Sequence, residues 1–177
     1  MTVHDLRLVG GGPGATLALR RHFKAALAAL GKPKPSVAYV GAASDDNHGF
    51  FTMIRGALAL GSSARMELAK IASPHAKASG ARALLEGCDL VFVSGGDVEH
   101  GMRVLHDRDL ARTLVSLGEG GKPFFGISRS DHAKTHVTEG ILQQFEHRLL
   151  VVNNHNQRLT SVLRGIQELL LLRRPRR

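Results

Sequence analysis

Short, uninterrupted apolar segments recur along this chain, and stretches with helical periodicity separate them. Leu90–Val93 is one such segment, whereas Phe23, Leu27 and Leu30 fall at i, i+4 and i+7, as on the buried face of a helix. Apolar strands that alternate with helices are typical of a parallel sheet covered on both faces. The sequence therefore predicts a three-layer α/β fold with a mostly parallel sheet and helices on both faces.

The pattern extends over most of the 177 residues. The predicted strands are 6–10, 36–41, 66–71 (an outer strand), 90–93, 124–125 and 149–152. Helices are predicted around 23–30, 50–58 and 76–85, over 98–117 as one helix or two, and around 159–170. Neither an internal repeat nor a linker is evident, so we expect a single domain over residues 1–172 and a basic tail over 173–177.

Small and polar residues follow most of the predicted strands. In a parallel sheet the loops beyond the carboxyl ends of the strands meet at one edge, where ligands bind. We expect the following loops at this edge: Gly10–Gly14, Ala42–Asp46, Ser94–Asp97, Ser128–Asp131 and Asn153–Asn156.

A serine directly follows the predicted strand at Phe124. The segment Gly126–Ser130 is similar to the Gly-x-Ser-x-Gly nucleophile elbow, although Ser130 replaces the second glycine. His155 follows the last predicted strand, and the pKa of histidine suits a general base for a serine nucleophile. Because the chain has ten histidines, a surface histidine is the alternative interpretation of His155.

Two glycine-rich loops each allow two interpretations. Gly95 and Gly96 could turn backbone N–H groups toward a bound oxygen, as an oxyanion hole requires, and Asp97 could cap the next helix. The segment Gly10–Ala15 fits a dinucleotide-binding fingerprint, but the second predicted strand does not end in the acidic residue that would hold a ribose. A tight turn is therefore favoured for that segment.

The remaining features exclude several kinds of protein. His132 and His136 lack a convincing third ligand, so we expect no metal site, and no cofactor is expected either. The net charge of +9 favours acidic partners, but aromatic residues are too scarce for a typical nucleic-acid surface. No signal peptide or membrane span is evident, so a cytoplasmic protein without a membrane partner is predicted. Cys88 is the only cysteine and is expected to have a packing role.

The order of these motifs resembles the peptidase E and cyanophycinase family of serine peptidases. The resemblance rests on the glycine-rich first loop, Ala42–Ser44, Gly95–Asp97, Gly126–Ser128 and Asn154–Asn156. It implies a class I glutamine amidotransferase-like fold of flavodoxin-like topology, and a hydrolase that cleaves aspartyl dipeptides or related polymers without metal. It also implies Ser128 as the nucleophile and His155 as its base, with the amides of Gly96 and Arg129 forming the oxyanion hole.

The resemblance leads to a first hypothesis, a serine hydrolase that acts on small acidic or aspartyl peptides. Gly95, Asp97, Arg129 and Asn154 are its candidate substrate-binding residues. Arg129 could instead occlude the pocket, since the family has a small residue there. Two alternatives stay open: a non-catalytic, ligand-binding member of the same fold, and a nucleotide- or flavin-binding protein. A homodimer is one open possibility for the assembly.

Overall fold

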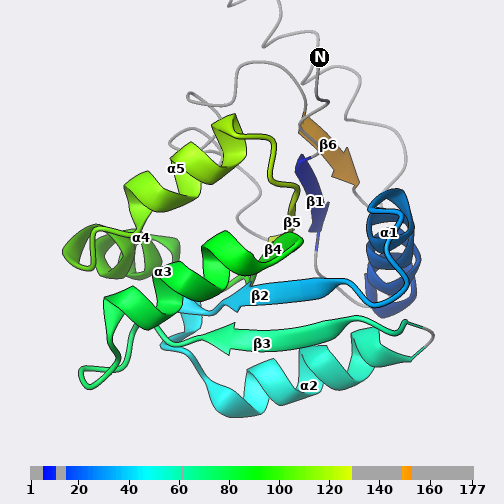
Figure 1. The fold of residues 1–177 in the computed structure, drawn as a ribbon. Helices are drawn as coiled ribbons and strands as arrows, with labels where there is room; N and C mark the ends of the chain where they lie inside the picture. The colour runs from blue at the N-terminus through cyan, green and yellow to red at the C-terminus, as the bar shows by residue number, and fades with distance from the viewer. Residues whose placement is uncertain (1–5, 11–14, 61, 129–148, 153–177) are drawn as a thin grey trace, which may run out of the picture.

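One parallel sheet forms the centre of the molecule. The computed structural model of the chain describes residues 6–10, 15–60, 62–128 and 149–152 (Figure 1). The strands are β1 (Leu6–Gly10), β2 (Ser36–Val40), β3 (Arg65–Ala69), β4 (Leu90–Val93), β5 (Phe124–Ser128) and β6 (Leu149–Val152). The helices are α1 (Ala15–Ala29), the 3-10 helix η1 (Ala42–Ser44), α2 (His48–Ala59), α3 (Ala78–Gly87), α4 (Val98–Asp107) and α5 (Ala111–Glu119).

The strand order is β3-β2-β4-β5-β1-β6, and every pair is parallel. The first four strands of this order repeat the 2-1-3-4 arrangement of flavodoxin-like sheets. The predicted fold class is thus confirmed. The outer position predicted for the strand near Met66 is also confirmed, because β3 lies at one end of the sheet.

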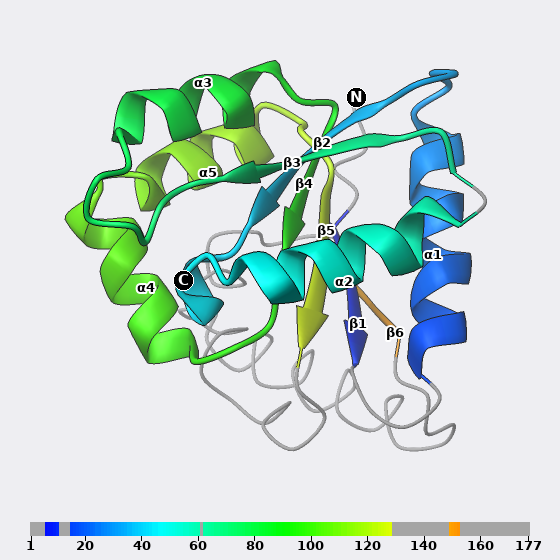
Figure 2. The ribbon, with the colours of Figure 1, turned by 90° about the horizontal axis from the view of Figure 1, so that it is seen from below.

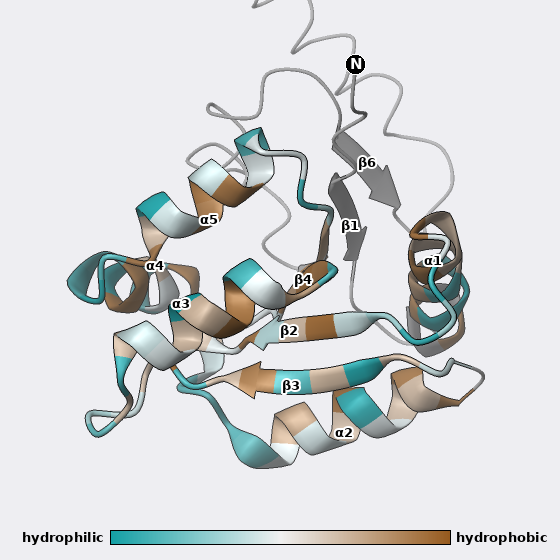
Figure 3. Ribbon diagram, in the orientation of Figure 1, coloured by the Kyte–Doolittle hydropathy of each residue, from teal (hydrophilic) through white to brown (hydrophobic). Residues whose placement is uncertain are grey.

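Helices cover both faces of the sheet, as Figure 2 shows. On one face, α1 and α2 bury Phe23, Leu27, Phe51 and Ile54 against the sheet. A second core, on the other face, contains residues of α3, α4 and α5. Hydrophobic and hydrophilic residues alternate along α2, α3 and α5 (Figure 3), as expected of helices with one buried side.

Aromatic rings dominate the core under α1 and α2. Tyr39, Phe92 and Phe125 occupy matching positions on the neighbouring strands β2, β4 and β5. Their rings stack at centroid distances of 5.3 and 5.7 Å, and Phe23 of α1 meets Phe92 and Phe125 edge-on. All four side chains are at most 2% exposed. This packing fixes the relative positions of β2, β4 and β5, and the carboxyl ends of β4 and β5 carry candidate site residues.

The stretch 98–117 forms two helices, which decides between the two predicted alternatives. α4 ends at Asp107, and Asp109 has a left-handed φ of +53°, which an α-helix cannot contain. The predicted helix around 159–170 and the basic tail lie outside the described residues, and the single domain stays a prediction. None of the helices in the described ranges is long and apolar enough to cross a membrane.

Candidate functional site

Ser128 is the last residue of β5, at the carboxyl edge of the sheet. It pairs in register with Gly10 of β1. On the other side of β5, Gly126 pairs with Val93 of β4. Ser128 follows Gly126 by two positions and Gly95 follows Val93 by two positions, so both lie just beyond the last pair of the β4–β5 ladder. The structure thus brings the predicted nucleophile position and the predicted oxyanion loop to adjacent strand ends.

The loop after β4 packs tightly on η1. The Asp97 N–H donates a 2.7 Å hydrogen bond to the carbonyl oxygen of Ala43. Gly96 has a φ of +157°, and a Cβ atom there would lie only 1.9 Å from the same oxygen. A Cβ on Gly101, one turn into α4, would lie 2.9 Å from the Ala43 backbone. Glycine is therefore required at position 96 for the loop to reach Ala43 so closely.

The backbone amides of Gly95 and Gly96 make no hydrogen bond to any other part of the chain that the structure describes. They precede α4, whose N-terminus carries a partial positive charge. The Asp97 carboxylate caps this helix by accepting a 3.0 Å hydrogen bond from the His100 N–H. The predicted helix cap is thus confirmed, whereas the substrate-binding role of Asp97 stays a prediction.

A histidine–aspartate pair, which sequence reasoning missed, borders the same loop. His100 Nε2 lies 2.5 Å from Asp45 Oδ1 and links α4 to the loop after η1. Asp45 and Asp46 both have left-handed backbone angles, with φ of +53° and +51°. Aspartate tolerates this conformation better than most residues, so the Asp-Asp-Asn run was a local signal for the turn. Nothing local marked His100 as its partner.

Several residues to which the sequence assigns or denies a role lie outside the described residues. They are Arg129, Asn154 and His155, together with Gly11–Gly14 of the first loop and the pair His132 and His136. For Ser128 the description covers the backbone. The roles assigned to these residues from the sequence therefore stay predictions. Within the described ranges, no three His, Cys, Asp or Glu side chains are grouped so as to hold a metal ion.

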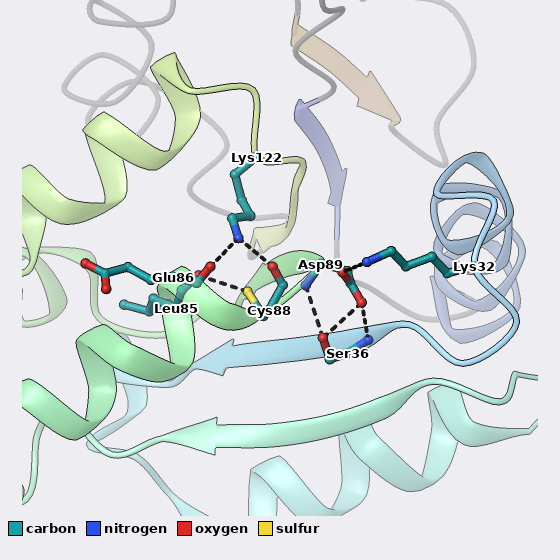
Figure 4. A network of polar contacts seen from close by, with 7 residues as sticks. All are labelled: Lys32, Ser36, Leu85, Glu86, Cys88, Asp89 and Lys122. Carbon is teal, nitrogen blue, oxygen red and sulfur yellow. Dashed lines mark hydrogen bonds and ion pairs between the residues drawn. The ribbon is translucent and has the colours of Figure 1, made fainter.

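A second polar network lies at the opposite, amino-terminal edge of the sheet (Figure 4). The Asp89 carboxylate is 2.5 Å from Lys32 Nζ and accepts a 2.8 Å hydrogen bond from the Ser36 N–H. The bond from Lys32, followed by that from Ser36, lowers the pKa of Asp89 to about 2. Lys122 donates to the carbonyl oxygens of Glu86 and Cys88. These contacts join strand and helix ends and are structural.

Cys88 belongs to the core beside this network. It is 4% exposed, and its thiol donates to the Leu85 carbonyl oxygen. Burial raises the pKa of the thiol, which disfavours the reactive thiolate. The predicted packing role fits these observations.

The molecule is a parallel α/β protein, in which Ser128 and the partly exposed Gly95–Gly96 loop stand at adjacent strand ends on the carboxyl edge of the sheet. Comparison with protein families narrows the class: the model of peptidase family S51 matches residues 6–129. Since the match covers more than half of the chain, the protein belongs to peptidase family S51, a family of peptidase hydrolases. The matched range includes Gly96 and Ser128 but not His155.

The chain was also compared with curated proteins and with solved structures. No curated protein matches the chain. Among solved structures, the chain is similar to the crystal structure of a peptidase from an acI-B1 Actinobacterium, with 18% identity and a TM-score of 0.46. The aligned region covers 68% of this chain and 52% of that one, so the chain spans about half the length of that structure.

Proposed function

We propose that the protein is a serine peptidase-type hydrolase in which Ser128 is the nucleophile. The observation that carries the proposal is the family S51 match over a range that contains both Ser128 and the Gly95–Asp97 loop. The position of Ser128 at the end of β5, next to the end of β4, supports it.

In the proposed reaction, the Ser128 hydroxyl oxygen attacks the carbonyl carbon of the scissile peptide bond. His155 accepts the hydroxyl proton and later returns it to the leaving amine. The resulting acyl-enzyme ester is hydrolysed by water, with His155 again acting as the base. The Gly96 and Arg129 amides stabilise the negative oxygen of each tetrahedral intermediate.

The proposed substrates are small aspartyl or otherwise acidic peptides. The net charge of +9 attracts anionic molecules. Arg129, which stands where relatives have a small residue, is proposed to bind a substrate carboxylate, together with Gly95, Asp97 and Asn154. A guanidinium group binds a carboxylate through two parallel hydrogen bonds, a geometry that lysine does not offer.

Hydrolysis of a panel of Asp-X dipeptides, with matched Glu-X and Ala-X dipeptides, tests this proposal. We expect the wild type to cleave Asp-X peptides and Ser128→Ala to lose the activity by about 10³-fold or more. Ser62→Ala is the matched control, since within the described ranges its hydroxyl bonds to one group, the Leu58 carbonyl oxygen near the end of α2. Equal inactivity of wild type and Ser128→Ala across the panel would contradict the proposal.

A non-catalytic, ligand-binding member of the family is the second candidate. The sequence Ser128-Arg129-Ser130 supports it, because a long side chain and a serine stand where the elbow pattern expects a small residue and a glycine. Such a protein would bind acidic peptides without cleaving them. Isothermal titration with the same dipeptides, alongside the activity assay, separates the two candidates.

A further inference from the structure

Three buried polar atoms gather where β2 and β4 end. Four buried side-chain polar atoms lack a hydrogen bond of normal geometry to another described residue, and three of them belong to Tyr39, Asp46 and Ser94. They are the hydroxyl oxygens of Tyr39 and Ser94 and Oδ1 of Asp46. Tyr39 is 0% and Ser94 4% exposed. Because buried polar groups normally pair with one another or with ordered water, each of these atoms needs an explanation.

Two of the three side chains, those of Asp46 and Tyr39, lie beside the backbone of Gly41. A Cβ atom on Gly41 would lie 3.2 Å from both Asp46 Oδ1 and Tyr39 Cε1. Burial raises the pKa of Tyr39, the nearby hydroxyls of Ser94 and Ser44 partly offset the rise, and the Asp46 charge adds to it. These groups are thus close enough to act on one another electrostatically.

The packing contacts of Tyr39 are made by its ring, and a phenylalanine could make them equally well. The tyrosine ring stacks on Phe92 and meets Phe51 edge-on, within an otherwise aromatic and aliphatic core. What distinguishes tyrosine from phenylalanine here is the oxygen that reaches the end of β2. A role for that oxygen must therefore come from the loops at this edge.

Ala43 lies in the turn Gly41–Asp46, next to the polar atoms of Tyr39, Ser94 and Asp46. On one side of Ala43, the N–H groups of Ser44 and Asp46 donate to the Gly41 carbonyl oxygen at 2.9 and 3.0 Å. The Asp46 carboxylate also accepts hydrogen bonds from the N–H groups of Ile71 and, at 2.7 Å, Ala72.

Ala43 in turn determines where the glycine loop lies. Its carbonyl oxygen accepts a hydrogen bond from the Asp97 N–H and occupies the space that a side chain on Gly96 would need. The Ser94 N–H donates at 3.0 Å to the Val40 carbonyl oxygen, which fixes the start of the same loop. The Gly95–Gly96 segment is therefore held at both ends. Ser94 bonds to Val40 at its start, and Asp97 bonds to Ala43 at its end.

We propose that Tyr39, Ser94 and Asp46 form a positioning network that holds Ala43 and, through it, the Gly95–Gly96 loop with the oxyanion-hole amide of Gly96. The inference rests on the proposed function of that loop. The three residues act through the backbone of Ala43 and do not touch the substrate.

Backbone hydrogen exchange tests the positioning independently of catalysis. In Tyr39→Phe and in Ser94→Ala, we expect the Asp97 amide, which is hydrogen-bonded to the Ala43 carbonyl oxygen, to exchange about tenfold faster than in the wild type. Ser36→Ala is the matched control, because it removes a hydroxyl from the opposite end of β2, where it bonds Asp89. It should leave the exchange of the Asp97 amide unchanged. Unchanged exchange in both test variants would overturn the inference.

The split between kcat and KM links the network to the reaction. We expect Tyr39→Phe to lower kcat about tenfold while KM changes less than about twofold, as for a loss of transition-state stabilisation. Raised exchange with an unchanged kcat would overturn the link to the oxyanion hole. Raised exchange in a protein whose wild type cleaves no peptide would support the positioning role and contradict the proposed function instead.

A spectroscopic readout shows whether the hydroxyls interact. Tyr39 is the only tyrosine and the chain has no tryptophan, so the near-ultraviolet tyrosine band reports on Tyr39 alone. Ser94→Ala and Asp46→Asn should each shift this band, and Ser36→Ala should not. If neither variant shifts it, the three groups are not a network and the inference fails.

Discussion

Replacing Gly96 by alanine tests how closely the glycine loop is held on η1. The new Cβ would lie 1.9 Å from the Ala43 carbonyl oxygen and 2.5 Å from its carbon, so the loop must move by more than an ångström. The movement strains the packing, at a cost of about 1–3 kcal/mol, and breaks the Asp97–Ala43 hydrogen bond, at about 1 kcal/mol. We therefore expect Gly96→Ala to lower the free energy of unfolding by about 2–4 kcal/mol.

Urea unfolding followed by circular dichroism measures this effect, and two other glycines calibrate it. Gly80 lies in α3, and a Cβ there meets nothing within 4 Å. Gly80→Ala should therefore stabilise the protein by about 0.5–1 kcal/mol through helix propensity. Gly101→Ala, with its 2.9 Å approach to Ala43, should fall between the two. A Gly96→Ala protein as stable as the wild type would refute the tight packing of this loop.

Two further predictions concern stability. Asp89→Asn removes a carboxylate whose pKa in the folded protein is about 2, below the ordinary value of 3.8. The contribution of this carboxylate to the free energy of unfolding is therefore present above about pH 4 and is lost as the pH falls toward 2. Because Lys32 is largely exposed, we expect a loss of about 1 kcal/mol near pH 7 and almost none near pH 2, measured by urea unfolding at both pH values; an equal loss at both would contradict this. Phe92→Ala, at 0% exposure, should cost about 3–5 kcal/mol in thermal or urea unfolding, whereas the exposed Leu60→Ala should change stability by less than about 0.5 kcal/mol. Similar effects of these two substitutions would contradict the assignment of the core.

Hydrophobic periodicity predicted the described strands and α-helices, though not the 3-10 helix η1, because each of them depends on residues that are close in sequence. The apolar run Leu90–Val93 and the stripe of Phe23 and Leu27 are such local signals. The cap at Asp97 was predictable for the same reason, since its partner is three residues away. Parallel pairing then placed Ser128 and Gly95 at one edge, because all strands of such a sheet point the same way.

The contacts that hold the loops of the site could not be predicted in this way. His100 and Asp45 are 55 residues apart, and no periodicity connects them. The approach of Gly96 to Ala43 depends on how α4 and η1 pack, and a Gly-Gly pair alone does not reveal its neighbour. Tyr39 looked like an ordinary strand residue, since only the fold shows its hydroxyl near Ser94.

Covalent labelling of Ser128 tests the proposed reaction most directly. The wild-type protein would be treated with a fluorophosphonate probe, digested and mapped by mass spectrometry, with Ser128→Ala and Ser62→Ala treated in parallel. We predict a single adduct on Ser128 in the wild type and in Ser62→Ala, and none in Ser128→Ala. An unlabelled wild type, or an adduct that persists in Ser128→Ala, would contradict the assignment of Ser128 as the nucleophile.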